Sequence, residues 1–251
     1  MNISLAAEPI FKIGNFSVTN SLLVSWLILL FLIGVALKIK SGLKLIPRGL
    51  QNVIEYVFEL FLDLIDGITQ NREQSRKFFP IVVTIFLFVI LVNWVGILPG
   101  LGTVGIYEQV AGHRVLVPFL RAASADLNFT LAIAIISVLT TQIFGVAAIG
   151  FAKYAGKFFI NPFKKPYFIG TFVGILELIS ETAKLVSFSF RLFGNIFAGE
   201  VLLTVMLFLV PYLVPLPFLA LEIFVGFIQA LVFSMLTLVF MKMATVAHEE
   251  H

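Results

Sequence analysis

The sequence predicts an all-α polytopic membrane protein with about five membrane-crossing helices. Of the 251 residues, 60% are hydrophobic and 12% are charged, and the mean hydropathy of +1.06 is far above that of water-soluble domains. Apolar runs of roughly 20 residues, enough to cross a hydrocarbon core of about 30 Å, recur along the chain. Most polar residues occur in short clusters between these runs, so residues 1–251 are expected to form a single membrane-embedded domain.

Three apolar runs have the length of one crossing, and two later runs are longer. Tyr167 to Pro211 has no internal proline, and its roughly 44 residues would extend about 66 Å as a helix, twice the membrane thickness. This helix must tilt steeply, bend or project from the bilayer. The predicted elements are spans at 18–37, 78–98 and 127–152, an amphipathic surface helix at 47–70, and a two-helix hairpin at 168–245.

The distribution of basic residues predicts the orientation, because cytoplasmic loops are enriched in Lys and Arg. Basic residues gather after the first and third spans, whereas the N-terminus and the segment from Gly100 to Asp126 have balanced charge. We therefore expect the N-terminus outside and the C-terminus in the cytoplasm. The first twenty residues lack the basic region and cleavable apolar core of a signal peptide, so the first span is expected to be retained.

The segment 47–70 has the pattern of an amphipathic helix. Its four acidic residues fall on one face of a 3.6-residue helix, and apolar residues occupy much of the remainder. This pattern favours a helix at the membrane surface with its polar face in water. An acidic face suits anionic headgroups poorly, so a docking surface for a partner protein is the alternative. The acidic residues are Glu55, Glu59, Asp63 and Asp66.

Six charged residues lie inside the last two helices, where each costs about 2.5–3.5 kcal/mol at the membrane centre. Glu181 and Lys184 have the spacing of an intrahelical salt bridge. Arg191 has no such partner, because Glu200 falls on the opposite side of the helix and about 13 Å further along its axis. The six residues are Glu177, Glu181, Lys184, Arg191, Glu200 and Glu222.

These charges and the polar residues near them form three groups along the expected membrane normal. Ser187 and Asn195 lie one turn on either side of Arg191, on a stripe that must face water or a partner. Two carboxylates close together in low dielectric cannot both ionise easily, so the outer pair could exchange protons. The pattern predicts a proton path interrupted by a fixed cation. The groups are Glu200 with Glu222 outside, Arg191 with Asn195 and Gln229 at the centre, and Glu177, Glu181 and Ser187 inside.

Other motifs indicate no catalytic, metal or cofactor site. There is no cysteine, and the three histidines are scattered. Gly150 to Lys157 resembles a phosphate loop only superficially, because five residues separate its glycines and no hydroxyl residue follows the lysine. The small residues Gly194, Ala198 and Gly199 allow another helix to approach closely, either a partner or the second helix of the hairpin.

The stretch SFSFRLFGNIFAGE at residues 187–200, with FIQALVFSMLTLVFMKMA downstream, resembles the signature hairpin of subunit a of the F-type rotary ATP synthase. NWVGILPG, SADLNFTLA, PRGLQNVIEYVFE and the terminal EEH extend the resemblance over nearly the whole chain. The resemblance implies one upright N-terminal helix, a surface helix, two further spans, and two long, strongly tilted helices along a rotor ring. Some members have histidine at the position of Glu222 and an acidic residue at that of Gly96.

The resemblance also implies a non-catalytic, proton-conducting stator subunit with two offset half-channels that couple the proton gradient to ATP synthesis. Arg191 would face the ring carboxylates and separate the half-channels. Glu200, Glu222, Asn195 and Gln229 would line the outer route, and Ser187, Glu177, Glu181 and Lys184 are candidates for the inner one.

The implied partners are a ring of small hairpin subunits (c subunits), b-type subunits of a peripheral stalk and the lipid bilayer, without nucleic acid, cofactor or small-molecule substrate. The expected location is the bacterial plasma (inner) membrane, with the proton as the transported ion. A self-contained secondary transporter or ion channel is the alternative, but the sequence has no internal repeat. A purely structural scaffold would not justify the cost of Arg191, Glu200 and Glu222.

Overall fold

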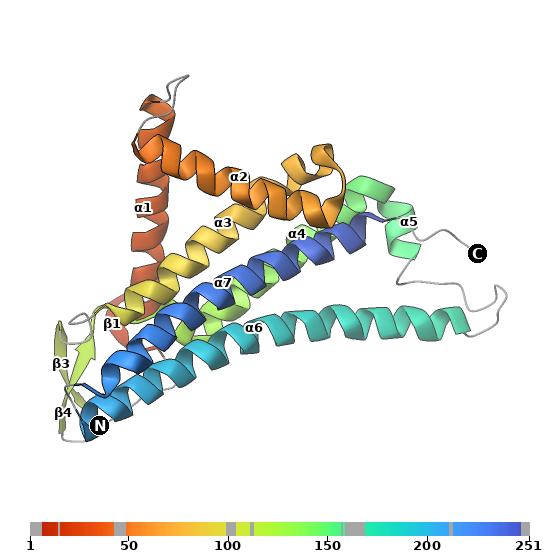
Figure 1. Cartoon of the computed structure of the whole chain (residues 1–251). Helices are drawn as coiled ribbons and strands as arrows, with labels where there is room; N and C mark the ends of the chain where they lie inside the picture. The colour runs from red at the N-terminus through yellow and green to blue at the C-terminus, as the bar shows by residue number, and fades with distance from the viewer. Residues whose placement is uncertain are drawn as a thin grey trace.

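A computed structural model describes residues 7–14, 16–42, 49–98, 104–110, 113–156, 158, 169–210 and 213–246 (Figure 1). Helices dominate this part of the chain, as the composition predicts. The elements, in chain order, are β1 (Pro9–Ile13), β2 (Phe16–Thr19), α1 (Asn20–Gly42), α2 (Leu50–Thr69), α3 (Arg72–Ile97), β3 (Gly105–Val110), β4 (His113–Pro118), the 3-10 turn η2 (Ala123–Ala125), α4 (Leu127–Ile149), α5 (Phe151–Gly156), α6 (Ile169–Leu209) and α7 (Pro215–Thr245).

Five of the helices, α1, α3, α4, α6 and α7, are long and apolar enough to cross a membrane, which confirms the predicted fold class. Two helix ends differ from the ends of the predicted spans. Helix α3 begins at Arg72 rather than residue 78, because the Asn71 side chain caps it by accepting hydrogen bonds from the backbone N–H groups of Glu73 and Gln74. Helix α4 ends at Ile149 rather than residue 152, because Gly150 follows with φ 83°, a conformation that favours glycine.

Two antiparallel β-hairpins, β1–β2 and β3–β4, were not expected from the sequence. They lie in the two segments predicted outside the membrane, where the chain cannot rely on burial in lipid. Figure 1 places β3, β4 and the α6–α7 turn at one end of the bundle, and α2 and α5 toward the other. This arrangement fits the alternation of loops that the basic residues predict.

Helices α6 and α7 form the predicted long hairpin. Helix α6 runs unbroken for 41 residues, about 61 Å at 1.5 Å per residue. In Figure 1 both helices lie steeply inclined to α1, and α6 extends beyond the end of α7. The α6–α7 hairpin therefore crosses the bundle obliquely relative to α1, as predicted for two strongly tilted helices beside a single upright one.

The core lies between α3, α4, α6 and α7, where Val89, Phe188 and Phe233 are buried. The buried turn η2 contacts α1, α3, α4 and α6, so it ties these helices together at the end of the bundle where β3 and β4 lie. At the opposite end the Lys242 ammonium of α7 donates hydrogen bonds of 2.9 Å to the Thr69 carbonyl and to Gln74 Oε1. The hairpin is therefore attached to the remainder of the bundle at both ends.

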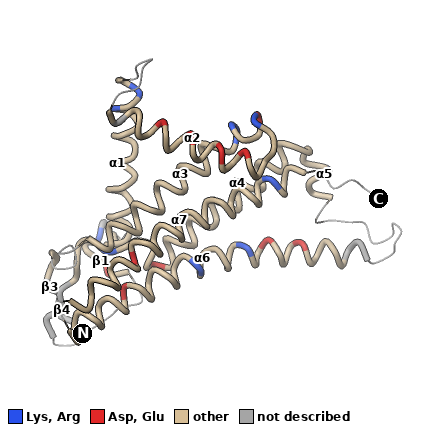
Figure 2. Tube along the Cα trace, viewed as in Figure 1, with Lys and Arg blue, Asp and Glu red and all other residues tan. Residues whose placement is uncertain are grey.

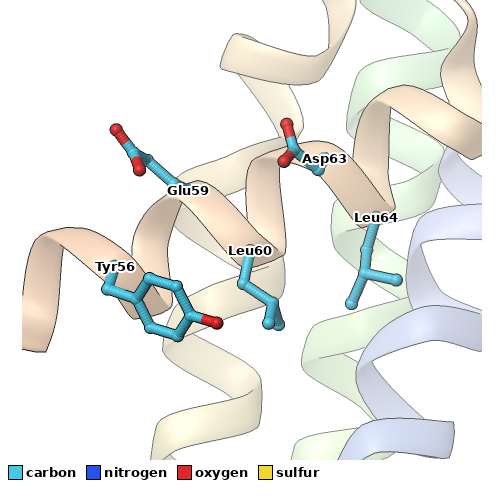
Figure 3. Close-up of a pocket in the computed structure, with 5 residues that line it drawn as sticks. All are labelled: Tyr56, Glu59, Leu60, Asp63 and Leu64. Atoms are coloured by element: carbon cyan, nitrogen blue, oxygen red, sulfur yellow. The ribbon is translucent and has the colours of Figure 1, made fainter.

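Helix α2 is amphipathic and packs on α3, as predicted for a surface helix. Phe61 and Ile65 are buried against the bundle. Figure 3 shows the carboxylates of Glu59 and Asp63 on one side of the helix and the Tyr56 side chain on another. Together with Leu60 and Leu64 these residues line a shallow depression of about 380 Å³. The acidic face is not continuous, because Asp66 pairs with Arg72 at the α2–α3 corner.

Candidate functional site

Arg191 lies on an exposed face of α6, as the sequence predicts for a stripe that faces water or a partner. Its guanidinium Nη2 donates a hydrogen bond of 3.4 Å to Ser187 Oγ, and its Cζ lies 6.0 Å from the centre of the Phe188 ring. Within the described residues no carboxylate forms an ion pair with Arg191. The predicted absence of an acidic partner in its own chain is confirmed for this part of the sequence.

The face around Arg191 is open. Asn195 is exposed on it, and a Cβ built on Gly194 would meet no atom within 4 Å. Figure 2 shows that charged positions recur along α6, inside a helix that is otherwise uncharged over most of its length. A fixed positive charge on an uncovered face of a membrane helix requires compensation from outside this fold.

The outer group is more organised than predicted. Arg121, in the segment between β4 and η2, binds the Glu200 carboxylate through one edge of its guanidinium: Nε lies 2.9 Å from Oε1 and 3.2 Å from Oε2, and Nη2 lies 3.2 Å from Oε2. The Arg121 side chain is 8% exposed and that of Glu200 is 32% exposed. In the sequence Arg121 stands only among the balanced charges of a predicted external loop, so its pairing with Glu200 was not predicted. The feature that could have predicted this ion pair is Glu200 itself, because an acidic residue inside a predicted membrane helix needs a positive charge nearby.

Glu222 of α7 completes the outer group. A Cβ built on Gly199 would lie 2.9 Å from Glu222 Oε1, so the carboxylate packs directly on the α6 backbone beside Glu200. The predicted proximity of the two acids is confirmed. The small residues of α6 have divided roles, because Gly199 receives this carboxylate from the hairpin itself, whereas Gly194 and Ala198 are exposed.

Helix α3 holds α7 at the level of Glu222. Asn93 Nδ2 donates a hydrogen bond of 3.0 Å to the Gly226 carbonyl, and Trp94 Nε1 donates one of 3.1 Å to the Ile223 carbonyl. Asn93 Oδ1 is buried and accepts no hydrogen bond from any described residue. Gly96, one turn after Asn93, has no room for the acidic side chain of some relatives, because its Cβ would lie 2.3 Å from that of Ala122.

Gln229 lies two turns after Glu222 on α7 and is partly buried. Its side chain makes no hydrogen bond with another described residue, and the same holds for Asn195 on α6. Two polar side chains without partners, at the depth between the outer carboxylates and Arg191, are free to bind water. The order of the groups along the membrane normal and the role of each residue stay predictions.

The inner group is built around the Glu181–Lys184 salt bridge, which was predicted and is present, with Nζ 2.6 Å from Oε1. Lys184 also lies 4.8 Å from the centre of the Phe240 ring. Gln142 of α4 donates a hydrogen bond of 2.9 Å to the second Glu181 oxygen, and Tyr154 of α5 donates its hydroxyl to Gln142. Gln142 and Tyr154 were missed, because nothing in the sequence relates a polar residue of one span to an acid of another.

Tyr154 is outside the spans and is buried. Burial, reinforced by the negative charges of Glu181 and Glu177, raises the pKa of Tyr154 to about 12. The hydroxyl therefore stays protonated and keeps donating to Gln142 over the physiological range. Ser187 is exposed one turn below Arg191, and Glu177 is partly buried near Tyr154.

The described residues include no group of three or more His, Cys, Asp or Glu that could hold a metal ion. His248 and His251 lie outside the described residues. The fold and the site together define a class: a multi-pass membrane protein with an arginine on an open helix face that has no carboxylate partner among the described residues, and with separate polar groups on either side of it along the hairpin.

The chain belongs to the ATP synthase A chain family, whose pattern matches residues 20–242. It is similar to ATP synthase subunit a of Moorella thermoacetica, with 31% identity over 92% of this chain and 93% of the relative. It is 35% identical to ATP synthase subunit a of Campylobacter jejuni over 90% and 89% of the two chains. With that of Gloeobacter violaceus it shares 34% identity over 96% and 89%. The resemblance stated from the motifs is confirmed, and with it a proton-transporting role in the membrane sector of an ATP synthase.

Proposed function

We propose that this chain provides two offset proton half-channels beside a rotor ring, kept apart by Arg191. The observation that carries the proposal is the exposed guanidinium of Arg191, which forms no ion pair with a carboxylate among the described residues. Arginine cannot lose its charge at physiological pH, so the cation needs a counter-charge from another molecule. A ring carboxylate that passes this face supplies that counter-charge once it has released its proton.

The outer half-channel leads from the β-hairpin end of the bundle past Glu200 and Glu222, then past Asn195 and Gln229 toward Arg191. These side chains are among the polar groups that α6 and α7 offer on that side of the arginine. A proton that enters here loads a ring carboxylate and leaves through the inner route after the ring has turned. Moving one charge across the membrane releases about 2.3 kcal/mol per 100 mV, which drives the rotation.

The inner half-channel begins at Ser187 and leads past Glu177, Glu181 and Lys184. Lys184 and Gln142 each donate a hydrogen bond to the Glu181 carboxylate, which fixes its position within this route. Glu177 lies one turn nearer the start of α6 and is the second acid of this route. We assign Glu181 to shaping the route, with Glu177 as a further acidic residue along it.

The proposed complex contains a ring of small hairpin subunits (c subunits) on the open face of α6 and b-type peripheral-stalk subunits on α2. It would lie in the bacterial plasma (inner) membrane with the N-terminus outside and the C-terminus in the cytoplasm. The proton is proposed as the transported ion, and no cofactor or small-molecule substrate is required. The chain itself would be a non-catalytic part of the synthase.

The test is Arg191→Ala in the assembled complex, measured as ATP-driven proton pumping and as ATP synthesis in membrane vesicles. We expect both activities to be lost, while the complex still assembles and hydrolyses ATP. Arg76→Ala is the matched control, because Arg76 is also an exposed arginine but lies in the first turns of α3 rather than on the open face of α6. Retention of coupled pumping by Arg191→Ala would refute the proposed role.

A further inference from the structure

We propose that Gln142 and Tyr154 are positioning residues of the inner route. They hold the Glu181 carboxylate so that it draws the Lys184 ammonium off the open face of α6, which leaves Arg191 as the cation that a ring carboxylate meets there. This inference rests on the proposed function and deepens it, because it concerns which charges of α6 act on the ring. Without this arrangement, Lys184 would be a second cation in the path of the ring.

Lys184 and Arg191 lie on the same side of α6 by helical geometry. They are seven residues apart, so their directions around the helix axis differ by only about 20°, and Lys184 lies about 10 Å nearer the start of the helix. The two side chains nevertheless differ in exposure. Arg191 is exposed, whereas the Lys184 side chain is only 18% exposed. The contacts of Lys184, rather than its backbone position, therefore take its charge away from this face.

Lys184 is held by one acid and one aromatic ring. Its Nζ lies 2.6 Å from Glu181 Oε1 and 4.8 Å from the centre of the Phe240 ring of α7. Both contacts attract an ammonium, because the carboxylate supplies a counter-charge and the face of the ring carries partial negative charge. A fully exposed pair of this kind contributes little. Here the Glu181 side chain is only 12% exposed and is also bound by a second helix, so the pair keeps one geometry.

Gln142 of α4 binds the other half of the Glu181 carboxylate. Its Nε2 donates a hydrogen bond of 2.9 Å to Oε2, while Lys184 donates to Oε1. The carboxylate is thus bound from its own helix and from a neighbouring one, and it cannot rotate toward the open face without losing a contact. An amide has a donor end and an acceptor end, so this contact exists in only one of the two orientations of the Gln142 amide.

Tyr154 of α5 selects that orientation. Its hydroxyl donates to Gln142 Oε1, which leaves Nε2 directed at Glu181. The Tyr154 ring is buried against Gly145 of α4, where an added Cβ would clash with it, and Gly150 at φ 83° separates α4 from α5. Because burial raises the pKa of Tyr154 to about 12, the hydroxyl remains a donor at physiological pH.

The groups that contact the Glu181–Lys184 pair from other helices are uncharged. Among the described residues, α4 contributes the Gln142 amide and α7 contributes the Phe240 ring. Glu177 lies one turn nearer the start of α6, and the ion pair that Lys184 makes in this part of the chain is with Glu181. Removing the Glu181 charge therefore leaves the ammonium without an acidic partner among the described residues.

The experiment compares Glu181→Gln, Lys184→Gln and the double variant as full complexes in inverted membrane vesicles. Glu181→Gln releases Lys184 to bind passing ring carboxylates, so ATP-driven proton pumping per complex should fall at least about tenfold. Lys184→Gln and the double variant lack the released charge, so each should pump at least about threefold faster than Glu181→Gln. A double variant as inactive as Glu181→Gln would overturn the inference, because Glu181 would then be required in its own right. Equal losses in the two single variants would also overturn it, since either substitution breaks a purely structural ion pair.

Gln142→Met tests the positioning role, because methionine has a similar length but cannot donate a hydrogen bond to Glu181. We expect pumping to fall at least about threefold in the original chain, and to change less than about 1.5-fold when Lys184→Gln is already present. The position of Glu181 matters only while Lys184 carries its charge. Tyr154→Phe should show the same dependence on Lys184. Losses of equal size in both backgrounds would indicate a structural role and refute the inference.

Thr140→Val is the matched control on α4, because the Thr140 hydroxyl donates to the Ile136 carbonyl of its own helix at 2.7 Å. It should leave pumping unaltered, and a loss as large as that of Gln142→Met would contradict a specific role for Gln142.

The Arg191→Ala test of the proposed function is independent of these variants. If Arg191→Ala destroys coupling while Glu181→Gln pumps at the original rate, only the role of the Glu181–Lys184 pair fails. If Arg191→Ala leaves coupling intact, the proposed function itself fails. Quantifying each variant in the membrane keeps both results separate from loss of assembly.

Discussion

The packing of Glu222 against Gly199 makes a specific prediction for Gly199→Ala. The added Cβ would lie 2.9 Å from Glu222 Oε1, 3.2 Å from Cδ and 3.4 Å from Cγ. The atoms that must move belong to the end of a flexible side chain, so the helices can stay in place. Alanine also favours a helix over glycine, which offsets part of any strain. We therefore expect normal assembly with a displaced carboxylate.

The expected magnitude follows from the displacement. Restoring an ordinary contact needs a shift of about half an ångström, which forces the Glu222 side chain off its rotamer at a cost of about 0.5–1.5 kcal/mol. Because about 1.4 kcal/mol corresponds to a tenfold change in rate, proton pumping should fall by about two- to tenfold. The assay is ATP-driven acidification of inverted membrane vesicles, normalised to the amount of complex.

The control is Gly34→Ala in α1, where an added Cβ would meet no atom within 4 Å. It introduces the same chemical change in another membrane helix and should leave pumping unaltered. Full pumping by Gly199→Ala would refute the reasoning, because it would mean that the position of the Glu222 carboxylate does not limit proton transfer. Loss of assembly would equally contradict the expectation that only a side chain moves.

Two predictions concern the end of the bundle near α2 and α5. Lys242→Ala removes two charged hydrogen bonds, to the Thr69 carbonyl and Gln74 Oε1, and should lower the free energy of unfolding by about 1.5–3 kcal/mol, measured by thermal denaturation of the purified complex. The surface pair variant Lys77→Ala should have little effect, and equal losses in the two would contradict this account. Burial raises the pKa of Tyr154 to about 12 from a usual value near 10, so ionisation in the unfolded chain should reduce stability as pH rises from about 10 to 12. Tyr154→Phe should lack this decline in a pH series of unfolding midpoints, and an identical decline would argue against it.

The membrane spans and the long hairpin could be predicted because hydropathy and length are local properties of the chain. Arg191 and the Glu181–Lys184 pair were also predictable, since helical periodicity fixes what lies near each residue on the same helix. The partner of Glu200 was not, because Arg121 is 79 residues away and reaches it only through the fold. Its place in a loop suggested a solvent-exposed charge, yet the loop packs inward between β4 and the buried turn η2.

The two β-hairpins were missed for a related reason. Each consists of short strands of four to six residues next to long apolar segments. Hydropathy, which identifies the membrane helices, does not distinguish such short strands from loops. A turn was signalled in the first hairpin by Gly14, which has φ 62°. Gln142 and Tyr154 had no such signal, because their roles arise only where α4, α5 and α6 meet.

The attachment of Lys242 has a mechanical consequence. In the proposed complex a turning ring pushes against the α6–α7 hairpin, and an equal and opposite force acts on the stationary subunit. Lys242 joins the last turn of α7 to the end of α2 and the start of α3. Load applied to the hairpin thus passes into the surface helix α2, the element proposed to meet the peripheral stalk, without first deforming the outer proton route. In the proposed complex, the Lys242 contact that transmits force and the carboxylates of the proposed outer route, Glu200 and Glu222, therefore lie at opposite ends of the bundle.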